Sequence, residues 1–271
     1  MTGKVVLITG ASAGIGFACA QHLSALQHTV IGASRRTSTA HAWSTIEMDV
    51  DDDQSVNAGV EHAITQYGGL DAVVTCAGWG LAGAIEQTPI EDARAQIETN
   101  FFGTVRAVVA ALPSLRRRSG NIIIMSSIGG TIGIPFQGYY SASKFALEGW
   151  AEALAWEVRP YGVKVTLIEP GNFRTEFTQS RRTVTVGGDD LYAAARTKAI
   201  DVMERDELAG ADPAAVARQV ANVLGSKRPP RRRTVGPGVE RLGPVAKRVL
   251  PGRVFEAASA SSLGMRTERT G

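Results

Sequence analysis

The sequence predicts an α/β fold in which helices cover both faces of a doubly wound parallel sheet, in a single domain. Short runs rich in Val and Ile recur between longer amphipathic stretches, which is the strand-helix alternation of such a sheet. These runs are apolar at nearly every position, and strands that do not alternate need helices on both faces. With 271 residues, 44% of them hydrophobic, the chain is long enough for one large core.

The predicted elements follow one another along most of the chain. Strands are expected at residues 5–9, 30–34, 46–50, 70–75, 121–126 and 163–168. Helices are expected between them at residues 14–27, 52–67, 89–117 and 138–159. The polar, glycine-containing segment 171–190 suits a mobile lid, and helical patterns at 189–207 and 213–225 precede a short strand at 232–235.

Composition excludes several classes of protein. No run approaches the roughly 18 consecutive apolar residues of a membrane span, and the first strand pattern begins at Val5, which leaves no room for a signal peptide. Cys19 and Cys76 are the only cysteines, so neither a disulfide framework nor a metal cluster is indicated. We therefore expect a cytoplasmic protein with no metal site.

The positive charge of the chain is concentrated near its C-terminal end. Residues 227–253 carry nine Lys or Arg against one Glu, so the rest of a chain with net charge +3 sums to −5. The interleaved prolines and glycines favour a solvated, basic extension over residues 237–271. Because apolar residues lie between the charges, a peripheral contact of residues 227–255 with an anionic membrane is an alternative interpretation. No nucleic-acid partner is expected.

A glycine-rich turn joins the first strand to the first helix. Glycines allow a tight turn and a close approach of the backbone to a pyrophosphate, whose charge is favoured at a helix N-terminus. A plain strand-helix turn is the simpler alternative. The residues expected to line the phosphate site are Gly10, Ser12, Ala13, Gly14, Ile15 and Gly16.

The end of the second strand indicates which nicotinamide dinucleotide binds. NAD-dependent enzymes commonly place an acid there for the ribose 2′-hydroxyl, whereas the 2′-phosphate of NADP needs positive charge. This strand ends in Ser34, Arg35 and Arg36, and guanidinium groups bind phosphate through paired, charge-assisted hydrogen bonds. NADP(H) is therefore the expected cofactor.

Tyr140 and Lys144 stand four residues apart, on one face of the helix expected at residues 138–159. Free tyrosine titrates near 10, and a nearby cation, together with the positive nicotinamide of the oxidised cofactor, would lower that pKa. Tyr139 is the rival, but four residues after it stands Ser143, which carries no charge. We expect Tyr140 to be the acid/base and Tyr139 to be a wall residue.

Two serines end the fifth strand of the predicted sheet. Ligands of open parallel sheets bind at the carboxyl ends of the strands, so a hydroxyl there can polarise a carbonyl oxygen while tyrosine protonates it. Ser127, thirteen residues before Tyr140, is the expected group, and Ser126 is the competing assignment.

Thr-Gly-x-x-x-Gly-Ile-Gly at residues 9–16, together with a serine upstream of Tyr-x-x-x-Lys, resembles the short-chain dehydrogenase/reductase family in its compact, single-domain branch. The resemblance covers roughly residues 3–236. It implies a Rossmann-like domain over residues 1–236 that binds NADP(H) and catalyses the reaction, with a substrate lid near residues 171–210. It also implies a homodimer or homotetramer.

The same resemblance implies roles for further residues. Asn100, in Asn-x-x-Gly, would belong to the catalytic set through a water-linked proton path to Lys144. Thr75 and Cys76 replace both asparagines of the family's Asn-Asn-Ala-Gly turn. Besides Asn100, Tyr140 and Lys144, the cofactor contacts are expected at Asp49, Val50, Cys76, Ala77, Gly78, Pro170, Gly171, Phe173 and Thr175.

The expected reaction is hydride transfer between nicotinamide and a ketone, aldehyde or alcohol. Ser127 would hold the oxygen, Tyr140 would transfer the proton, and Lys144 would bind the ribose and lower the pKa of the tyrosine. The residues between Ser127 and Tyr140 are similar to those of steroid- and retinol-metabolising members, and a hydrophobic substrate is expected. Its candidate wall residues are Trp79, Ile128, Ile134, Phe136 and Phe173.

Three other functions compete with this interpretation. A sugar-nucleotide epimerase or dehydratase also uses Tyr-x-x-x-Lys, but with a Thr-Gly-x-x-Gly-x-x-Gly turn that this chain lacks. A non-catalytic NADP(H) sensor usually loses the tyrosine, lysine or serine, all of which are present. An NAD-dependent alcohol dehydrogenase would place an acid where Arg35 stands.

The two arginines after the second strand generate a binding prediction. We expect NADP(H) to bind at least about tenfold more tightly than NAD(H), which corresponds to about 1.4 kcal/mol or more. A fluorescence titration with each dinucleotide measures the difference, and equal affinities would refute the prediction.

Overall fold

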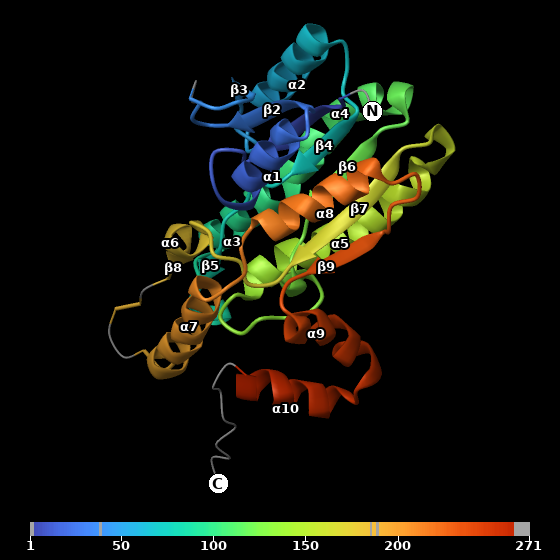
Figure 1. Ribbon diagram of the computed structural model, residues 1–271. Coiled ribbons are helices and arrows are strands. Elements are labelled where there is room, and N and C mark those ends of the chain that lie inside the picture. Colours follow the sequence, from blue (N-terminus) through green and yellow to red (C-terminus); the bar gives the residue numbers. More distant parts are fainter. Residues whose placement is uncertain (1–2, 38–39, 185, 188–189, 263–271) are drawn as a thin grey trace.

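The central sheet holds seven parallel strands in the order β3-β2-β1-β4-β6-β7-β9 (Figure 1). The computed structural model describes residues 3–37, 40–184, 186–187 and 190–262. Starting from β1, the chain first adds β2 and β3 on one side of it, and then adds β4, β6, β7 and β9 on the other side. The predicted doubly wound sheet is therefore confirmed. The strands are β1 (Val5–Thr9), β2 (Thr29–Ser34), β3 (Ser44–Glu47), β4 (Ala72–Thr75), β6 (Asn121–Met125), β7 (Lys164–Pro170) and β9 (Arg232–Val235).

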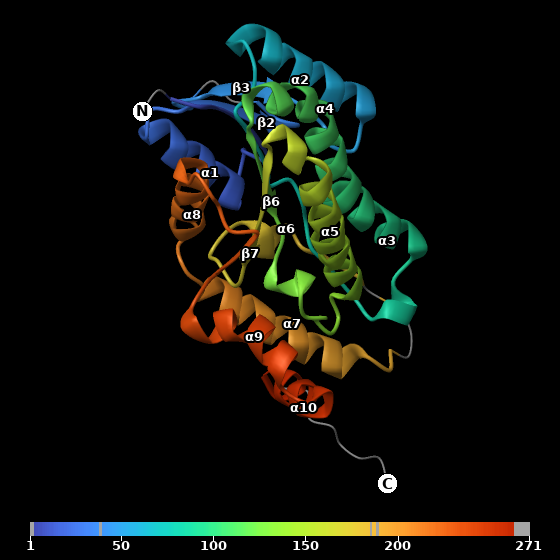
Figure 2. The ribbon, with the colours of Figure 1, turned by 90° about the vertical axis from the view of Figure 1, so that its right-hand side faces the viewer.

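Helices cover both faces of this sheet (Figure 2). One face packs against α1 (Gly14–Ala25) and α8 (Ala214–Gly225), and the other against α2 (Asp53–Tyr67), α4 (Gly103–Arg118) and α5 (Gly138–Glu157). Successive residues of a strand point to opposite faces, so Leu7 is buried in one core and Ile8 in the other. This two-sided burial explains why the strands are apolar without alternation.

Two predicted elements differ from the observed ones. The strand expected at residues 46–50 is β3, which ends at Glu47, because the N–H of Asp49 donates to Ser55 Oγ at 2.9 Å in the turn into α2. The single helix expected at residues 89–117 consists of α3 (Ile90–Ile97), the π-helical turn η2 (Glu98–Phe102) and α4. A π-turn inserts one extra residue into a helix and re-aims its neighbours.

The segment after β7 forms short elements over the carboxyl edge of the sheet. In it lie α6 (Phe177–Ser180), β8 (Arg182–Thr183) and α7 (Ala193–Leu208), and β8 pairs with β5 (Leu81–Ala82). The expected lid lies within these elements, apart from residues 185, 188 and 189, which fall outside the described part of the chain. The mobility of this lid stays a prediction. The short 3-10 helices are η1 (Ile85–Gln87), η3 (Ile128–Gly130) and η4 (Arg159–Tyr161).

The chain continues beyond β9 into two helices that the sequence patterns did not predict. They are α9 (Gly238–Val249) and α10 (Gly252–Ser262), and they lie beyond one end of the sheet (Figure 1). Gly243 and Pro244 interrupt the helical pattern within α9, which is why it was missed. Among the described residues, none of the helices is both long and apolar enough to cross a bilayer.

Arg232 ties the edge strand β9 to the neighbouring elements. Its Nε lies 2.9 Å from Glu148 Oε2 and 3.7 Å from Glu169 Oε1, and its Nη2 lies 3.1 Å from Glu152 Oε2. Burial raises the pKa of Glu169. The guanidinium therefore neutralises the carboxylates of Glu148 and Glu169, which the fold has taken out of water.

We expect Arg232→Leu to lower the free energy of unfolding by about 2 kcal/mol at neutral pH. This loss is smaller than the roughly 3–5 kcal/mol that is lost when one partner of a fully buried ion pair is removed, because the guanidinium is partly exposed. The difference in unfolding free energy between wild type and variant should become smaller as pH falls. Protonation of Glu169 removes the carboxylate charge that the variant leaves unpaired. Urea unfolding measures both effects, and Arg218→Leu, at an exposed arginine on α8, is the control.

Candidate active site

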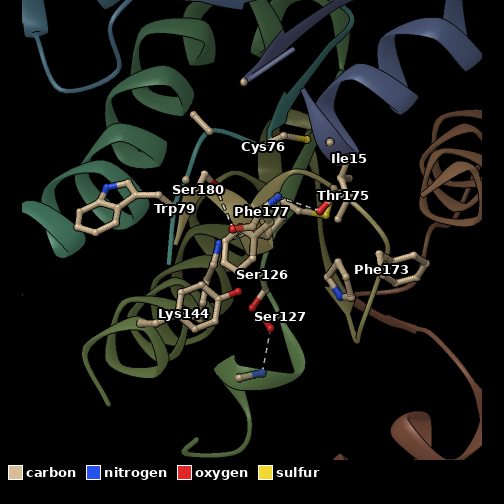
Figure 3. A pocket seen from close by; sticks show the side chains of 18 of the residues that line it. Ile15, Cys76, Trp79, Ser126, Ser127, Lys144, Phe173, Thr175, Phe177 and Ser180 are labelled. Atoms are coloured by element: carbon tan, nitrogen blue, oxygen red, sulfur yellow. Dashed lines mark hydrogen bonds between the residues drawn. The ribbon is translucent and has the colours of Figure 1, made fainter. Parts of the chain in front are cut away.

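A cleft of about 1120 Å³ opens at the carboxyl ends of the parallel strands. Its volume is close to the upper end of the range for small-molecule and cofactor sites. Apart from Asn100, which was predicted in both sets, all predicted cofactor residues and all predicted catalytic residues line it. In Figure 3, Ser126, Ser127 and Lys144 lie on one side of Phe177 and Thr175, while Ile15 and Cys76 lie on the other.

The glycine turn has the backbone that its sequence predicts. Gly10 and Gly14 have φ values of 67° and 55°, a left-handed region that favours glycine. Thr9 Oγ1 accepts hydrogen bonds from the N–H groups of Cys76 and Ala77 at 3.2 and 3.3 Å. A side chain at Gly10 would collide with the backbone of Ala77, so the two segments that line this part of the cleft are held in contact.

A carboxylate already caps the N-terminus of α1. The N–H of Gly14 donates to Glu176 Oε2 at 3.0 Å, and Thr175 packs beside the same glycine. This contact shows that the turn presents a backbone N–H to an anion, as the N-terminus of a helix does. Glu176 was not predicted as a site residue, although it follows Thr175 directly; no local pattern distinguishes it.

The opposite part of the cleft is bordered by the ends of β2 and β3. Ser34, Arg35 and Arg36 line it together with Asp49 and Val50, and both arginines are exposed. No acid stands among residues 34–36 to meet a ribose 2′-hydroxyl. A further acid was missed by the sequence patterns: Asp51 lines the same region and accepts a hydrogen bond from Thr99 at 2.9 Å. Burial raises its pKa.

Tyr140 and Lys144 lie on the same face of α5, as predicted. The Lys144 ammonium is 5.8 Å from the centre of the Tyr140 ring and donates to the carbonyl of Met125 at 2.9 Å. Burial lowers the pKa of Lys144 to about 8. Phe177, from α6, packs against the tyrosine with ring centres 5.7 Å apart.

Burial has the largest effect on the pKa of Tyr140 in the protein alone. Burial raises it to about 12, a hydrogen bond with Ser127 acts in the opposite direction, and the charge of Glu207 adds to the rise. Lys144 is not among the groups that shift this pKa in the protein alone, and its ammonium donates to a backbone carbonyl. The lowering of the pKa by Lys144 together with the oxidised cofactor stays a prediction.

The contacts distinguish between the two candidate catalytic serines and between the two candidate catalytic tyrosines. Ser126 is buried and donates to Glu148 Oε1 at 2.6 Å, within the network of Arg232, whereas Ser127 Oγ accepts from Gly129 N–H at 3.0 Å and lies beside Tyr140. The prediction that Tyr139 is a wall residue is wrong: it lies outside the residues that line the cleft, because its hydroxyl donates to the carbonyl of Ile85. The geometry favours Ser127 and Tyr140.

Asn100 lies behind the cleft and not in its wall. The π-helical turn buries its side chain completely. Its Nδ2 donates to the carbonyl of Trp79 and to Ser143 Oγ, both at 3.1 Å, and its Oδ1 accepts from the N–H of Trp79 at 3.0 Å. This amide therefore ties the Gly78–Trp79 turn to α5, the helix of Tyr140 and Lys144.

The substrate side of the cleft is largely apolar. Trp79, Ile128, Ile134 and Phe173 line it as expected, but Phe136 does not, because its ring packs against Tyr192. The sequence patterns missed several other lining residues. They include Ile132, Phe177, Met203, Glu207, Glu240 and Phe255.

Comparison with known proteins identifies the family. The family model described as short chain dehydrogenase matches residues 4–185. The chain belongs to the short-chain dehydrogenase/reductase family. It is 41% identical over 261 residues to a 3-ketodihydrosphingosine reductase of Bacteroides thetaiotaomicron, covering 95% of this chain and 97% of that protein.

Other members of the family are similar over most of their length. Retinol dehydrogenase 8 of Homo sapiens is 34% identical over 259 residues, 85% of this chain and 80% of its own. The crystal structure of a short-chain dehydrogenase from Streptomyces avermitilis superposes with a TM-score of 0.83 at 30% identity, covering 97% of this chain and 98% of that one. This short-chain dehydrogenase/reductase is an oxidoreductase that acts on CH–OH or C=O groups, and the family uses NAD(P)(H).

The pKa values of Tyr140 and Lys144 generate a pH prediction. With its pKa near 12 the phenol stays protonated, whereas the ammonium, with its pKa near 8, is lost above about pH 8. We expect kcat/KM for carbonyl reduction to be level near pH 7 and to fall about tenfold per pH unit above about 8. A pH-rate profile checks this, and a profile that stays level beyond about pH 9 would contradict it.

Proposed function

We propose that this short-chain dehydrogenase/reductase is an NADPH-dependent reductase of ketones carried on long apolar chains. The observation that carries the proposal is the meeting of Ser127 with the buried Tyr140 and Lys144 in one cleft with the glycine turn and an apolar wall. The similarity to a protein named 3-ketodihydrosphingosine reductase makes 3-ketodihydrosphingosine the first substrate to assay.

The cofactor residues fit NADP(H). The N-terminus of α1, where Gly14 already donates to a carboxylate, receives the pyrophosphate. Arg35 and Arg36 meet the 2′-phosphate, and Asp49 and Val50 border the adenine. The nicotinamide side is formed by Cys76, Ala77, Gly78, Pro170, Gly171, Phe173 and Thr175. NADPH, when bound there, supplies the hydride.

Each catalytic residue has one role in this proposal. Ser127 donates a hydrogen bond to the carbonyl oxygen, and Tyr140 gives that oxygen a proton as negative charge develops on it. Lys144 binds the ribose and keeps a positive charge close to the phenol. Asn100 acts as a positioning residue, since its amide holds the turn at Trp79 against α5.

The apolar part of the cleft supports a lipophilic substrate. Isoleucines and aromatic rings from four separate segments surround the space beside Tyr140, with Phe177 packed on the tyrosine itself. Such a wall favours the burial of an alkyl chain.

We also propose the setting in which the protein acts. Exposed apolar side chains on α4 and α5, among them Val109 and Trp156, suit a homodimer or homotetramer built through these helices. Two free cysteines suit a reducing, cytoplasmic environment.

Replacing the proton donor tests the proposed function. We expect Tyr140→Phe to lower kcat for reduction of 3-ketodihydrosphingosine by at least about 100-fold, because the phenol supplies the proton. NADPH binding should change little, since the ring remains. The matched control is Tyr139→Phe, which removes a hydroxyl outside the cleft. NADPH consumption and a binding titration measure the two effects, and retained turnover in Tyr140→Phe would overturn the mechanism.

A further inference from the structure

Helix α9 is held to the protein by hydrogen bonds of Glu240 and Lys247, while Leu242, Val245 and Val249 are exposed. Glu240 Oε2 and Oε1 accept hydrogen bonds from the backbone N–H and the Nδ2 of Asn172 at 3.0 and 2.9 Å. The Lys247 ammonium donates to the carbonyl of Thr131 at 2.6 Å and lies over the ring of Phe145. The helix is therefore anchored through polar contacts, the reverse of an ordinary surface helix.

The outer face of α9 carries an apolar stripe of Leu242, Val245 and Val249. Their spacing of three and four residues places them on one face, and they are 62%, 54% and 72% exposed. Leu250 and Val254, which follow at the turn into α10, are exposed as well. Packing of α10 on α9 leaves this stripe in contact with water.

Cations accompany the stripe. Arg241, Lys247, Arg248 and Arg253 are exposed on the two helices, against one exposed acid, Glu256. A second copy of the chain, seated stripe to stripe, would bring these cations together and be repelled. An anionic lipid surface supplies both the opposite charge and an apolar layer for the aliphatic side chains.

The two helices also form a wall of the catalytic cleft. Glu240 and Gly243 of α9 and Phe255, Ser259 and Ser262 of α10 line it. The residues of α10 recur at intervals of three and four, so one face of that helix is turned to the cleft. The two helices that bear the stripe therefore also border the cleft.

We infer that α9 and α10 form a docking surface for an anionic lipid bilayer, with Leu242, Val245 and Val249 inserted at the headgroup boundary and the arginines on the lipid phosphates. The docking requires neither the proposed substrate nor turnover. In this inference the basic residues of the C-terminal segment bind lipid phosphates, a role that the sequence alone did not decide.

Vesicle co-sedimentation of the full chain tests the inference. We expect the protein to sediment with vesicles of phosphatidylcholine and phosphatidylglycerol, and far less with phosphatidylcholine alone. Leu242→Glu/Val249→Glu should weaken binding at least about tenfold, since it removes two apolar contacts. The matched control, Leu26→Glu/Ile90→Glu, changes two exposed apolar residues elsewhere and should bind like the wild type.

A second pair of variants tests the charges. Arg241→Gln/Arg253→Gln should weaken binding to the anionic vesicles, and Arg117→Gln/Arg218→Gln, at exposed arginines outside the two helices, should not. Raising the salt from about 0.1 M to about 1 M shortens the Debye length from about 10 to about 3 Å and should weaken wild-type binding as well.

Two results would overturn the inference. One is equal sedimentation of the wild type and Leu242→Glu/Val249→Glu with the anionic vesicles, or sedimentation of neither. The other is a smaller oligomer for that variant in size-exclusion chromatography without lipid, which would mean that a second copy covers the stripe. Carbonyl reduction in lipid-free buffer is the check on folding and should be unchanged.

Discussion

Seven strands running in one direction bring their carboxyl ends to a single edge of the sheet, and this shared direction decides where every polar group of the site can lie. Both faces of the central strands are buried under helices, so on these strands a charged or hydroxyl side chain reaches water mainly beyond the strand ends. β1 leads into the glycine turn, β4 into Cys76, β6 into Ser127 and β7 into the Pro170–Thr175 segment. Residues more than a hundred positions apart in sequence therefore line one cleft.

The sequence predicted the parts of the molecule in which local pattern and tertiary environment agree. The strands are apolar because both faces are covered, and Gly10 and Gly14 are glycines because their φ values are positive. Glu176 and Glu240 were not predicted, because their partners, Gly14 and Asn172, lie 162 and 68 residues away. Helix α9 was missed for another reason: its apolar residues point outward, and Gly243 and Pro244 break the pattern.

The pKa values at the centre of the site depend on burial more than on pairing. A sequence shows that Tyr140 and Lys144 share a helix face, but not that both are enclosed. Enclosure disfavours the charged form of each, so the phenol becomes a weaker acid and the ammonium a stronger one. A phenol that remains protonated at neutral pH suits the donation of a proton to a carbonyl oxygen, which is the direction of reduction.

Glu240 connects the C-terminal helices to the reacting end of the cleft. Its carboxylate rests on Gly171 so closely that any side chain at that glycine would overlap it, and it binds both the N–H and the amide of Asn172. The Pro170–Thr175 segment, proposed to border the nicotinamide, is thus held from outside by the helix that carries the exposed stripe. A force that shifts α9 would act on this segment through two hydrogen bonds. Contact with a lipid surface would therefore bear on cofactor geometry as well as on substrate entry.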